Sequence, residues 1–171
     1  RTIHILIVTM THHHEKPEIS DEEKARILQE RLQLGFNMIP FNQSIGLKVT
    51  EMTFTAIRAE FAMQPQLIGN MFKQILHGGV IATALDSVGG AMAMSAAYAA
   101  LKGTPREERL ARINRLATID MRIDYLQSGK VQCFTATASL LRVGKKVCVT
   151  RMELHNDSGE MIAAGTATYM Y

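Results

Sequence analysis

The segment from Gly79 to Ala100 restricts the fold more than any other part of the sequence. It reads GVIATALDSVGGAMAMSAAYAA, and nearly every residue in it is small or apolar. Such a run predicts a helix, and a helix of this texture must be covered over most of its surface. Its single charged residue is Asp86. We therefore expect a chain built around one buried helix that carries a carboxylate.

The rest of the chain supplies the surface that would cover this helix. Strand patterns occupy four segments of the last third, at 119–125, 134–140, 147–155 and 161–171. Glycine marks each turn between them, at Gly129, Gly144 and Gly159. Two more strands, with a break near Thr53, are predicted between Ile45 and Met63. Short strands separated by turns predict an antiparallel sheet, so the fold class is α+β, with the sheet wrapped on the helix.

Two further helices flank this core. Ser20 and Glu23 have the spacing of a capping box, which predicts a helix from there to about Asn37, ended by Pro40. A second capping pattern at Thr104, with Pro105 in the first turn, predicts a short basic helix that ends near residue 115. No internal repeat or linker is found. We divide the chain into a disordered or vector-derived tail at 1–19, an N-terminal helix at 20–39 and one domain at 40–171.

Charge and cysteine content exclude several classes of protein. The net charge is +3, from 19 Lys and Arg against 16 Asp and Glu, and so small a surplus does not predict binding to nucleic acid. No run of about 18 apolar residues is found, so no membrane-spanning segment is expected. Two cysteines are too few for a disulfide scaffold and indicate a cytoplasmic protein with reduced thiols. Three histidines in the tail, at 12–14, lack the fixed geometry of a metal site, so no metal is expected.

The tripeptide His77-Gly78-Gly79 opens the apolar helix. The first turn of a helix has free backbone N–H groups and the positive end of the helix dipole. Two glycines leave these N–H groups without side chains around them, so the turn can serve as an oxyanion hole for a polarised carbonyl. The alternative is that the glycines only permit a tight turn into the helix.

Asp86 is the candidate catalytic group. A carboxylate within an apolar helix is costly unless it is paired or functional, and the residues three and four positions away are all small. The alternative is a buried carboxylate bonded to the backbone or to a hydroxyl such as that of Ser87. Gly79 and Asp86 lie about 10 Å apart along one helix, which is wide for a single site. Two antiparallel copies of the helix in a dimer would bring the two ends together.

The HGG motif, the aspartate nine residues after its histidine and the strands around them resemble a hotdog-fold acyl-CoA thioesterase of the PaaI type. The resemblance runs from about Pro40 to Tyr171 and includes Leu47, the segment 117–126 and the ending 165–169. It implies a six-stranded antiparallel sheet around a long central helix, in homodimers and often in tetramers made of two dimers. It also implies hydrolysis of acyl-CoA thioesters to free acid and CoA without a metal or an organic cofactor.

The resemblance assigns roles to single residues. Asp86 matches the catalytic carboxylate, acting as general base or as nucleophile, and Gly78 and Gly79 match the backbone donors to the oxyanion. His77 matches the motif histidine, whose role is to shape the turn, and Thr118 matches a hydroxyl that helps to hold the water.

Two positions in the loop before the motif depart from the pattern of this family. Asn70 resembles the asparagine that helps to polarise the carbonyl, but it lies seven residues before His77 rather than six, and Met71 occupies the usual position. Gln74 stands where a glycine is usual, three residues before His77.

A cluster of cations is the candidate site for the phosphates of CoA. Arg142, Lys145 and Lys146 flank the predicted turn at Gly144. Cationic side chains of this kind bind phosphate groups through charge-assisted hydrogen bonds. The alternative is a solvated turn with ordinary surface charges.

Three other functions compete with hydrolysis. A hotdog hydratase or dehydratase uses a catalytic histidine together with an acid on the helix, whereas the histidine here lies in the turn. A hotdog sensor that controls DNA binding would need a helix-turn-helix, and residues 20–37 predict one helix only. A non-enzymatic acyl-CoA-binding protein would not need Asp86, and an assay for hydrolysis separates it from an enzyme.

Overall fold

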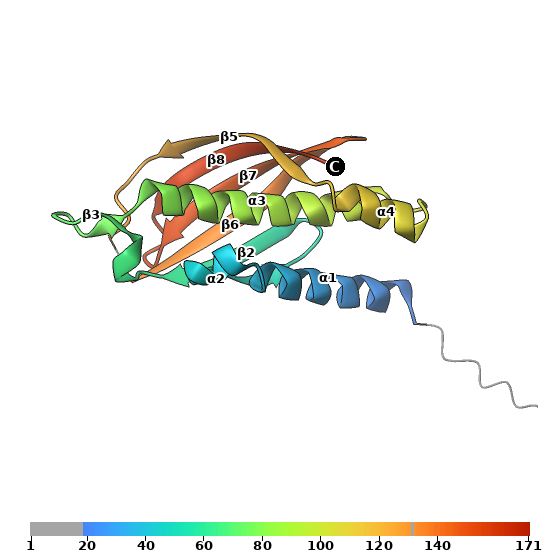
Figure 1. The fold of residues 1–171 in the computed structure, drawn as a ribbon, viewed down its shortest axis with the longest axis horizontal. Helices are drawn as coiled ribbons and strands as arrows, with labels where there is room; N and C mark the ends of the chain where they lie inside the picture. The colour runs from blue at the N-terminus through green and yellow to red at the C-terminus, as the bar shows by residue number, and fades with distance from the viewer. Residues whose placement is uncertain (1–18, 131) are drawn as a thin grey trace, which may run out of the picture.

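A computed structural model describes residues 19–130 and 132–171 (Figure 1). Apart from its last residue, the tail predicted at 1–19 lies outside the described residues. The described chain forms a six-stranded antiparallel sheet, in the order β1-β2-β6-β7-β8-β5, with the long helix α3 against one of its faces. This is the hotdog arrangement that the sequence predicts.

The strands and helices have the following bounds. The sheet consists of β1 (Lys48–Met52), β2 (Ala56–Ala62), β5 (Ala117–Tyr125), β6 (Cys133–Val143), β7 (Val147–Asn156) and β8 (Met161–Met170). The helices are α1 (Asp21–Asn37), α2 (Pro40–Ser44), α3 (Gly78–Ala100) and α4 (Arg106–Ile113). A short hairpin, β3 (Ile68–Asn70) and β4 (Ile75–Leu76), precedes α3 and was not predicted.

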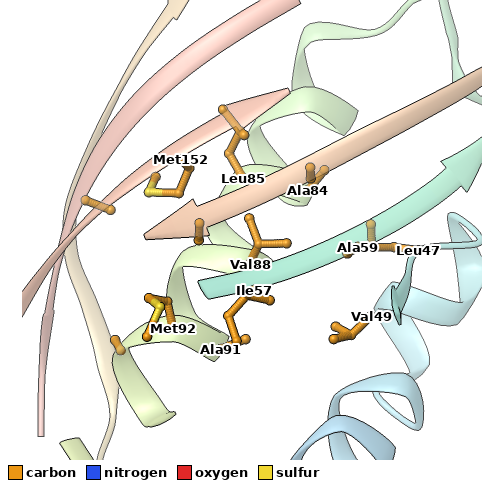
Figure 2. Close-up of a cluster of buried hydrophobic side chains, with 14 of the residues drawn as sticks. Leu47, Val49, Ile57, Ala59, Ala84, Leu85, Val88, Ala91, Met92 and Met152 are labelled. Carbon is orange, nitrogen blue, oxygen red and sulfur yellow. The ribbon is translucent and has the colours of Figure 1, made fainter. Parts of the chain in front are cut away.

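Helix α3 forms the centre of the hydrophobic core. Its side chains at Leu85, Val88 and Met92 are fully buried at helical spacing, against Ile57 of β2 and Met152 of β7 (Figure 2). Contrary to our expectation from the sequence, this helix is long and apolar enough to cross a membrane by length and composition alone. However, 61% of its most apolar stretch is buried inside the protein, as in the core helix of a soluble domain.

Helix α1 lies beside the β1 edge of the sheet (Figure 1). Its predicted start is confirmed, because Ser20 Oγ accepts a hydrogen bond from the Glu23 N–H at 3.2 Å. The Asn37 side chain fixes its other end: its Oδ1 accepts from the Val49 N–H at 2.7 Å and its Nδ2 donates to the Val49 carbonyl. Pro40 does more than end the helix, because it occupies the first position of α2, where proline is tolerated.

The start of α4 differs from the prediction. Thr104 was expected as the cap, but Pro105 holds the cap position, and no side-chain hydrogen bond closes the first turn. Both cysteines are free thiols, Cys133 exposed and Cys148 buried. The division of the chain at residue 40 stays a prediction.

Candidate active site

Asp86 lies half-buried on α3, facing two neighbouring strands. Its Oδ1 accepts hydrogen bonds from Thr118 Oγ1 on β5 and from Tyr169 Oη on β8, each at 3.1 Å. Thr118 and Tyr169 are directly paired in the sheet, so the strand register places both hydroxyls under one carboxylate oxygen. No Lys, Arg or His of the described residues forms an ion pair with Asp86. The Asp86 Oδ2 accepts no hydrogen bond from any described residue.

Tyr169 belongs to this site but was not predicted as part of it. Its hydroxyl also lies 3.1 Å from the Asp86 carbonyl oxygen, so it contacts both the backbone and the side chain of the aspartate. Burial raises the pKa of Tyr169 well above its usual value, and the negative charge of Asp86 raises it further. The phenol therefore stays protonated and donates to the carboxylate. Knowledge of the β5–β8 register would have identified it.

The two glycine N–H groups at the start of α3 differ in their surroundings. His77 is the N-cap residue, and its Nδ1 accepts a hydrogen bond from the Gly79 N–H at 2.8 Å. The Gly78 N–H has no hydrogen-bond partner among the described residues, whereas the Gly78 carbonyl accepts from Tyr125 Oη at 3.2 Å. In this structure the open donor of the turn is Gly78, and His77 holds the N–H of Gly79.

Asn70 lies in the β3–β4 hairpin, which packs against the His77 turn. A Cβ atom added at Gly69 would lie 2.6 Å from His77 Cα, so the two segments are in close contact. The Asn70 Oδ1 accepts a hydrogen bond from the Lys73 N–H at 3.0 Å, within the hairpin itself. Gln74 has φ of 53°, a left-handed conformation that favours glycine. The amide oxygen of Asn70 therefore stabilises the loop that carries it.

The two ends of the predicted site are far apart within one chain. Gly78 and Asp86 are eight residues apart on α3, which corresponds to about 12 Å along the helix axis. A reacting carbonyl must lie roughly 3 Å from both the base and the oxyanion donor. One chain does not provide this geometry with Asp86 and Gly78 alone.

A cavity of about 430 Å³ opens beside the Asp86 carboxylate. Among residues 19–130 and 132–171, Asp86 is the only charged one that lines it. The polar part of the lining consists of Asp86, Thr118, Tyr169, Asn42, Ser87 and Asn114. The larger apolar side chains come from all four helices, from the residue before α2 and from the segment before β5, and they are Phe36, Ile39, Phe41, Met94, Ile113 and Leu116. The cavity thus joins a carboxylate to an apolar wall.

The predicted cation cluster is only partly assembled. Lys145 and Lys146 line a cleft of about 580 Å³ together with Arg112 and Arg115, which come from α4 and the residues after it. Arg112 donates a hydrogen bond to the Lys145 carbonyl, which ties α4 to the β6–β7 turn. Arg142 is exposed on β6 and is not part of this cleft. The two arginines were not predicted as site residues, although the basic helix that carries them was.

Proteins of known family and structure resemble this chain. A family model described as the thioesterase superfamily matches residues 73–163. The medium/long-chain acyl-CoA thioesterase YigI of Salmonella typhimurium is 43% identical over 132 residues, which cover 77% of this chain and 85% of that protein. A Shewanella oneidensis protein related to the thioesterase superfamily has a crystal structure with a TM-score of 0.81 and 43% identity, over 86% of this chain and 97% of that chain. A putative thioesterase from Syntrophus aciditrophicus has a TM-score of 0.75 and 38% identity over the same shares.

Proposed function

The chain belongs to the thioesterase superfamily and is a thioester hydrolase, and we propose that it hydrolyses medium- and long-chain acyl-CoA esters at Asp86. The names of the curated relatives support this substrate class. The observation that carries the assignment of the site is the Asp86 carboxylate, held by two hydroxyls at the mouth of a cavity with an apolar wall. A cavity of this size lies within the usual range for small-molecule sites.

The geometry at Asp86 supports a role as general base or as nucleophile. Thr118 and Tyr169 occupy Oδ1, which leaves Oδ2 available to a water molecule or to the thioester carbonyl. As a base, Asp86 takes a proton from water while the oxygen attacks the carbonyl, and the intermediate then expels the CoA thiolate. As a nucleophile, its carboxylate attacks the carbonyl and expels the CoA thiolate to form an anhydride, which water then hydrolyses. In both routes the Gly78 N–H stabilises the oxyanion, and the His77 turn and Asn70 position this donor.

The wide separation of Gly78 and Asp86 supports a homodimer in which each site uses both chains. Strand β5 is an edge strand, paired with β8 alone, and its Ile119 and Tyr125 side chains are each 55% exposed. An unpaired edge is a surface on which another chain can add. Pairing of two β5 edges would set the two α3 helices antiparallel, with the start of one near Asp86 of the other. Two such dimers would make a tetramer.

The basic cleft supports a site for the CoA phosphates. Lys145 and Lys146 line it together with Arg112 and Arg115, and Arg142 lies nearby on β6 as a further cation for the flexible nucleotide. No metal or organic cofactor takes part in the proposed reaction. Two free thiols are consistent with a cytoplasmic location, which we retain as part of the proposal.

Replacement of Asp86 by asparagine tests the proposed function. Asp86→Asn keeps the size of the side chain but removes its basicity, so kcat on an acyl-CoA ester should fall by roughly 10²-fold or more with little change in KM. The melting temperature should stay the same or rise, because an unpaired, half-buried charge is lost. Asp157→Asn, in the exposed β7–β8 turn, is the matched control. An active but destabilised Asp86→Asn protein would show that the aspartate is structural.

A further inference from the structure

We propose that the end of α1 and the first residues of α2 form the binding site for the acyl chain, with Phe36, Ile39 and Phe41 selecting its length. The proposal rests on the proposed function, because it takes Asp86 as the group that acts on the thioester. It assigns a role to α1 and α2, for which the sequence alone predicts none. It also names the residues that discriminate between long and short substrates.

The cavity at Asp86 fixes where the acyl chain begins. The thioester carbonyl must come within roughly 3 Å of the attacking oxygen, and the first carbons of the acyl chain are bonded to that carbonyl. They therefore enter the space that Asp86 and Thr118 line. The neighbouring apolar lining residues are Phe36 at the end of α1, Ile39 between α1 and α2, and Phe41 on α2.

The distribution of cationic side chains assigns the two ends of the substrate to different spaces on the protein. Of the residues that the structure describes, no lysine or arginine lines the cavity at Asp86, so it offers no cationic side chain to the phosphates of CoA. The cations lie instead in the cleft of Arg112, Arg115, Lys145 and Lys146. The chemistry of the two spaces thus places the apolar part of the substrate against α1 and α2.

The side chains of α2 leave apolar surface that a ligand would cover. Phe41 is 62% exposed although it is aromatic and lies beside the candidate site. Ile39 is exposed as well. Burial of apolar surface by a bound chain is favourable by roughly 25 cal/mol per Å². Met38 lies between the two helices and is equally exposed, at 63%, but it does not line the cavity.

Hydrogen bonds fix the apolar wall, which we define as Phe36, Ile39 and Phe41, next to Asp86. The Asn42 side chain is 4% exposed, and its Oδ1 accepts a hydrogen bond from Ser87 Oγ at 3.0 Å. Its Nδ2 donates to the Phe36 carbonyl at 3.3 Å. Asn42 thus joins α1, α2 and α3 at the residue that follows Asp86. A wall fixed in this way can measure the length of a chain whose first atom is held at the carboxylate.

The experiment compares wall variants over a series of saturated acyl-CoA esters from four to sixteen carbons. We expect Phe41→Ala and Ile39→Ala to lower kcat/KM for the long esters by roughly tenfold relative to the short ones, because each removes apolar contacts that only a long chain makes. Met38→Ala and Leu34→Ala are the matched controls, since Leu34 on α1 and Met38 just after it are both exposed and neither lines the cavity. Both controls should keep the wild-type length profile.

A variant that narrows the cavity tests the same proposal by excluding the acyl chain. A Cβ atom at Gly90 would meet only Tyr169 Cε1, at 3.6 Å, so a side chain there can enter the cavity. Gly90→Leu should abolish hydrolysis of the longest esters first. Binding of dodecanoyl-CoA to Asp86→Asn, measured by calorimetry, should weaken on addition of Phe41→Ala, which gives a readout independent of turnover.

The outcomes separate this inference from the proposed function. An unchanged length profile in the wall variants, in a protein that Asp86→Asn inactivates, overturns the inference and leaves the function in place. Wall variants that dissociate the oligomer without altering the profile would assign this face to a second copy of the chain, and would also overturn it. If the wild-type protein hydrolyses no ester of the series, the proposed function fails and the inference fails with it.

Discussion

At the scale of single residues, the Asp86 carboxylate is positioned by two neutral donors rather than by a cation. A lysine or arginine partner would hold the carboxylate in its ionised form but would also lower its basicity. The hydroxyls of Thr118 and Tyr169 orient one oxygen and carry no charge. This arrangement suits a carboxylate that has to accept a proton or form a bond.

Tyr169→Phe measures how much the hydrogen bond from the Tyr169 hydroxyl to Asp86 contributes to kcat. The change removes one hydrogen bond to a charged group, so we expect kcat to fall by roughly tenfold while KM stays within about twofold. The unfolded fraction should rise slightly, because the Asp86 carbonyl also loses this contact. Steady-state kinetics on one acyl-CoA ester gives the result. Tyr98→Phe, on α3 but outside the site, is the control, and an unchanged kcat in Tyr169→Phe would leave Thr118 as the only relevant donor.

The same variant should also respond differently to high pH. The pKa of Tyr169 is raised above its usual value of 10 by burial and then by the Asp86 charge. Above pH 10 the folded chain therefore retains a proton that the unfolded chain loses, and stability falls as the pH rises. Tyr169→Phe removes this loss. Its melting temperature should fall less between pH 9 and pH 11 than that of the wild type, and equal slopes would contradict the assignment.

At this scale, a contact can be predicted from the sequence only when the interacting residues lie close together along the chain. The role of His77 in shaping the turn is implied by the resemblance of the HGG motif, and its Nδ1 accepts a hydrogen bond from the Gly79 N–H at the start of the helix. Tyr169 is 83 residues from Asp86, and only the β5–β8 register brings them together. Asn42 is 45 residues from Ser87, and no local pattern marks that contact.

At the scale of elements, the adjacent glycines Gly89 and Gly90 in the middle of α3 have different surroundings. A Cβ atom on Gly89 would lie 2.3 Å from Tyr169 Oη and 3.1 Å from both Met152 Sδ and Thr150 Oγ1. The helix approaches the sheet this closely only because position 89 has no side chain. Gly90 lies one residue further round the helix, where a Cβ atom has room.

This difference predicts opposite effects of one substitution at neighbouring positions. Gly90→Ala should raise the free energy of unfolding by about 0.5–1 kcal/mol, because alanine loses less backbone entropy in a helix. Gly89→Ala should lower it by about 1–3 kcal/mol, because the core is overpacked. It should also lower kcat, since the displaced Tyr169 no longer holds Asp86. Thermal or urea unfolding of the two variants gives the comparison, and similar shifts would show that the helix can move.

The elements themselves are largely predictable, and the exceptions have local causes. The apolar stripe of α1, the small and apolar texture of α3 and the strand and turn patterns predict these helices and the six strands of the sheet, and the structure contains all of them. The β3–β4 hairpin was missed because Gln74, at φ 53°, occupies a turn position that glycine usually marks. The first turn of α4 begins after Pro105 without a side-chain cap, so the prediction that Thr104 caps this helix is wrong.

At the scale of the whole molecule, the proposed site uses two copies of the chain. Asp86 and the open Gly78 N–H lie too far apart on α3 to act on the same carbonyl. The sequence indicates this separation through the helical rise alone. In the proposed dimer the two copies pair through β5, an edge strand whose Tyr125 donates a hydrogen bond to the Gly78 carbonyl. The helical rise does not indicate this surface, because it depends on the order of the strands in the sheet.

Two inactive variants should therefore restore activity when they are combined in one dimer. Asp86→Asn removes the carboxylate, and Gly78→Pro removes the open N–H at the first helical position, where proline fits and where His77, at ψ 134°, already has the conformation that precedes proline. Each homodimer should lose roughly 10²-fold or more in kcat. A dimer with one copy of each variant has one site built from the two intact halves. Its kcat per dimer should be about half that of the wild type.

Co-expression of the two variants with different affinity tags, followed by two purification steps, isolates this mixed dimer. A dimer of Asp86→Asn with a wild-type copy, prepared in the same way, is the control and should also reach about half of the wild-type kcat. If Asp86 and Gly78 acted within one chain, both chains of the first mixed dimer would be defective, and its kcat would be as low as that of the homodimers. The control dimer would be half-active in either case. The first mixed dimer alone thus decides whether the carboxylate of one chain and the helix start of its partner act on the same thioester.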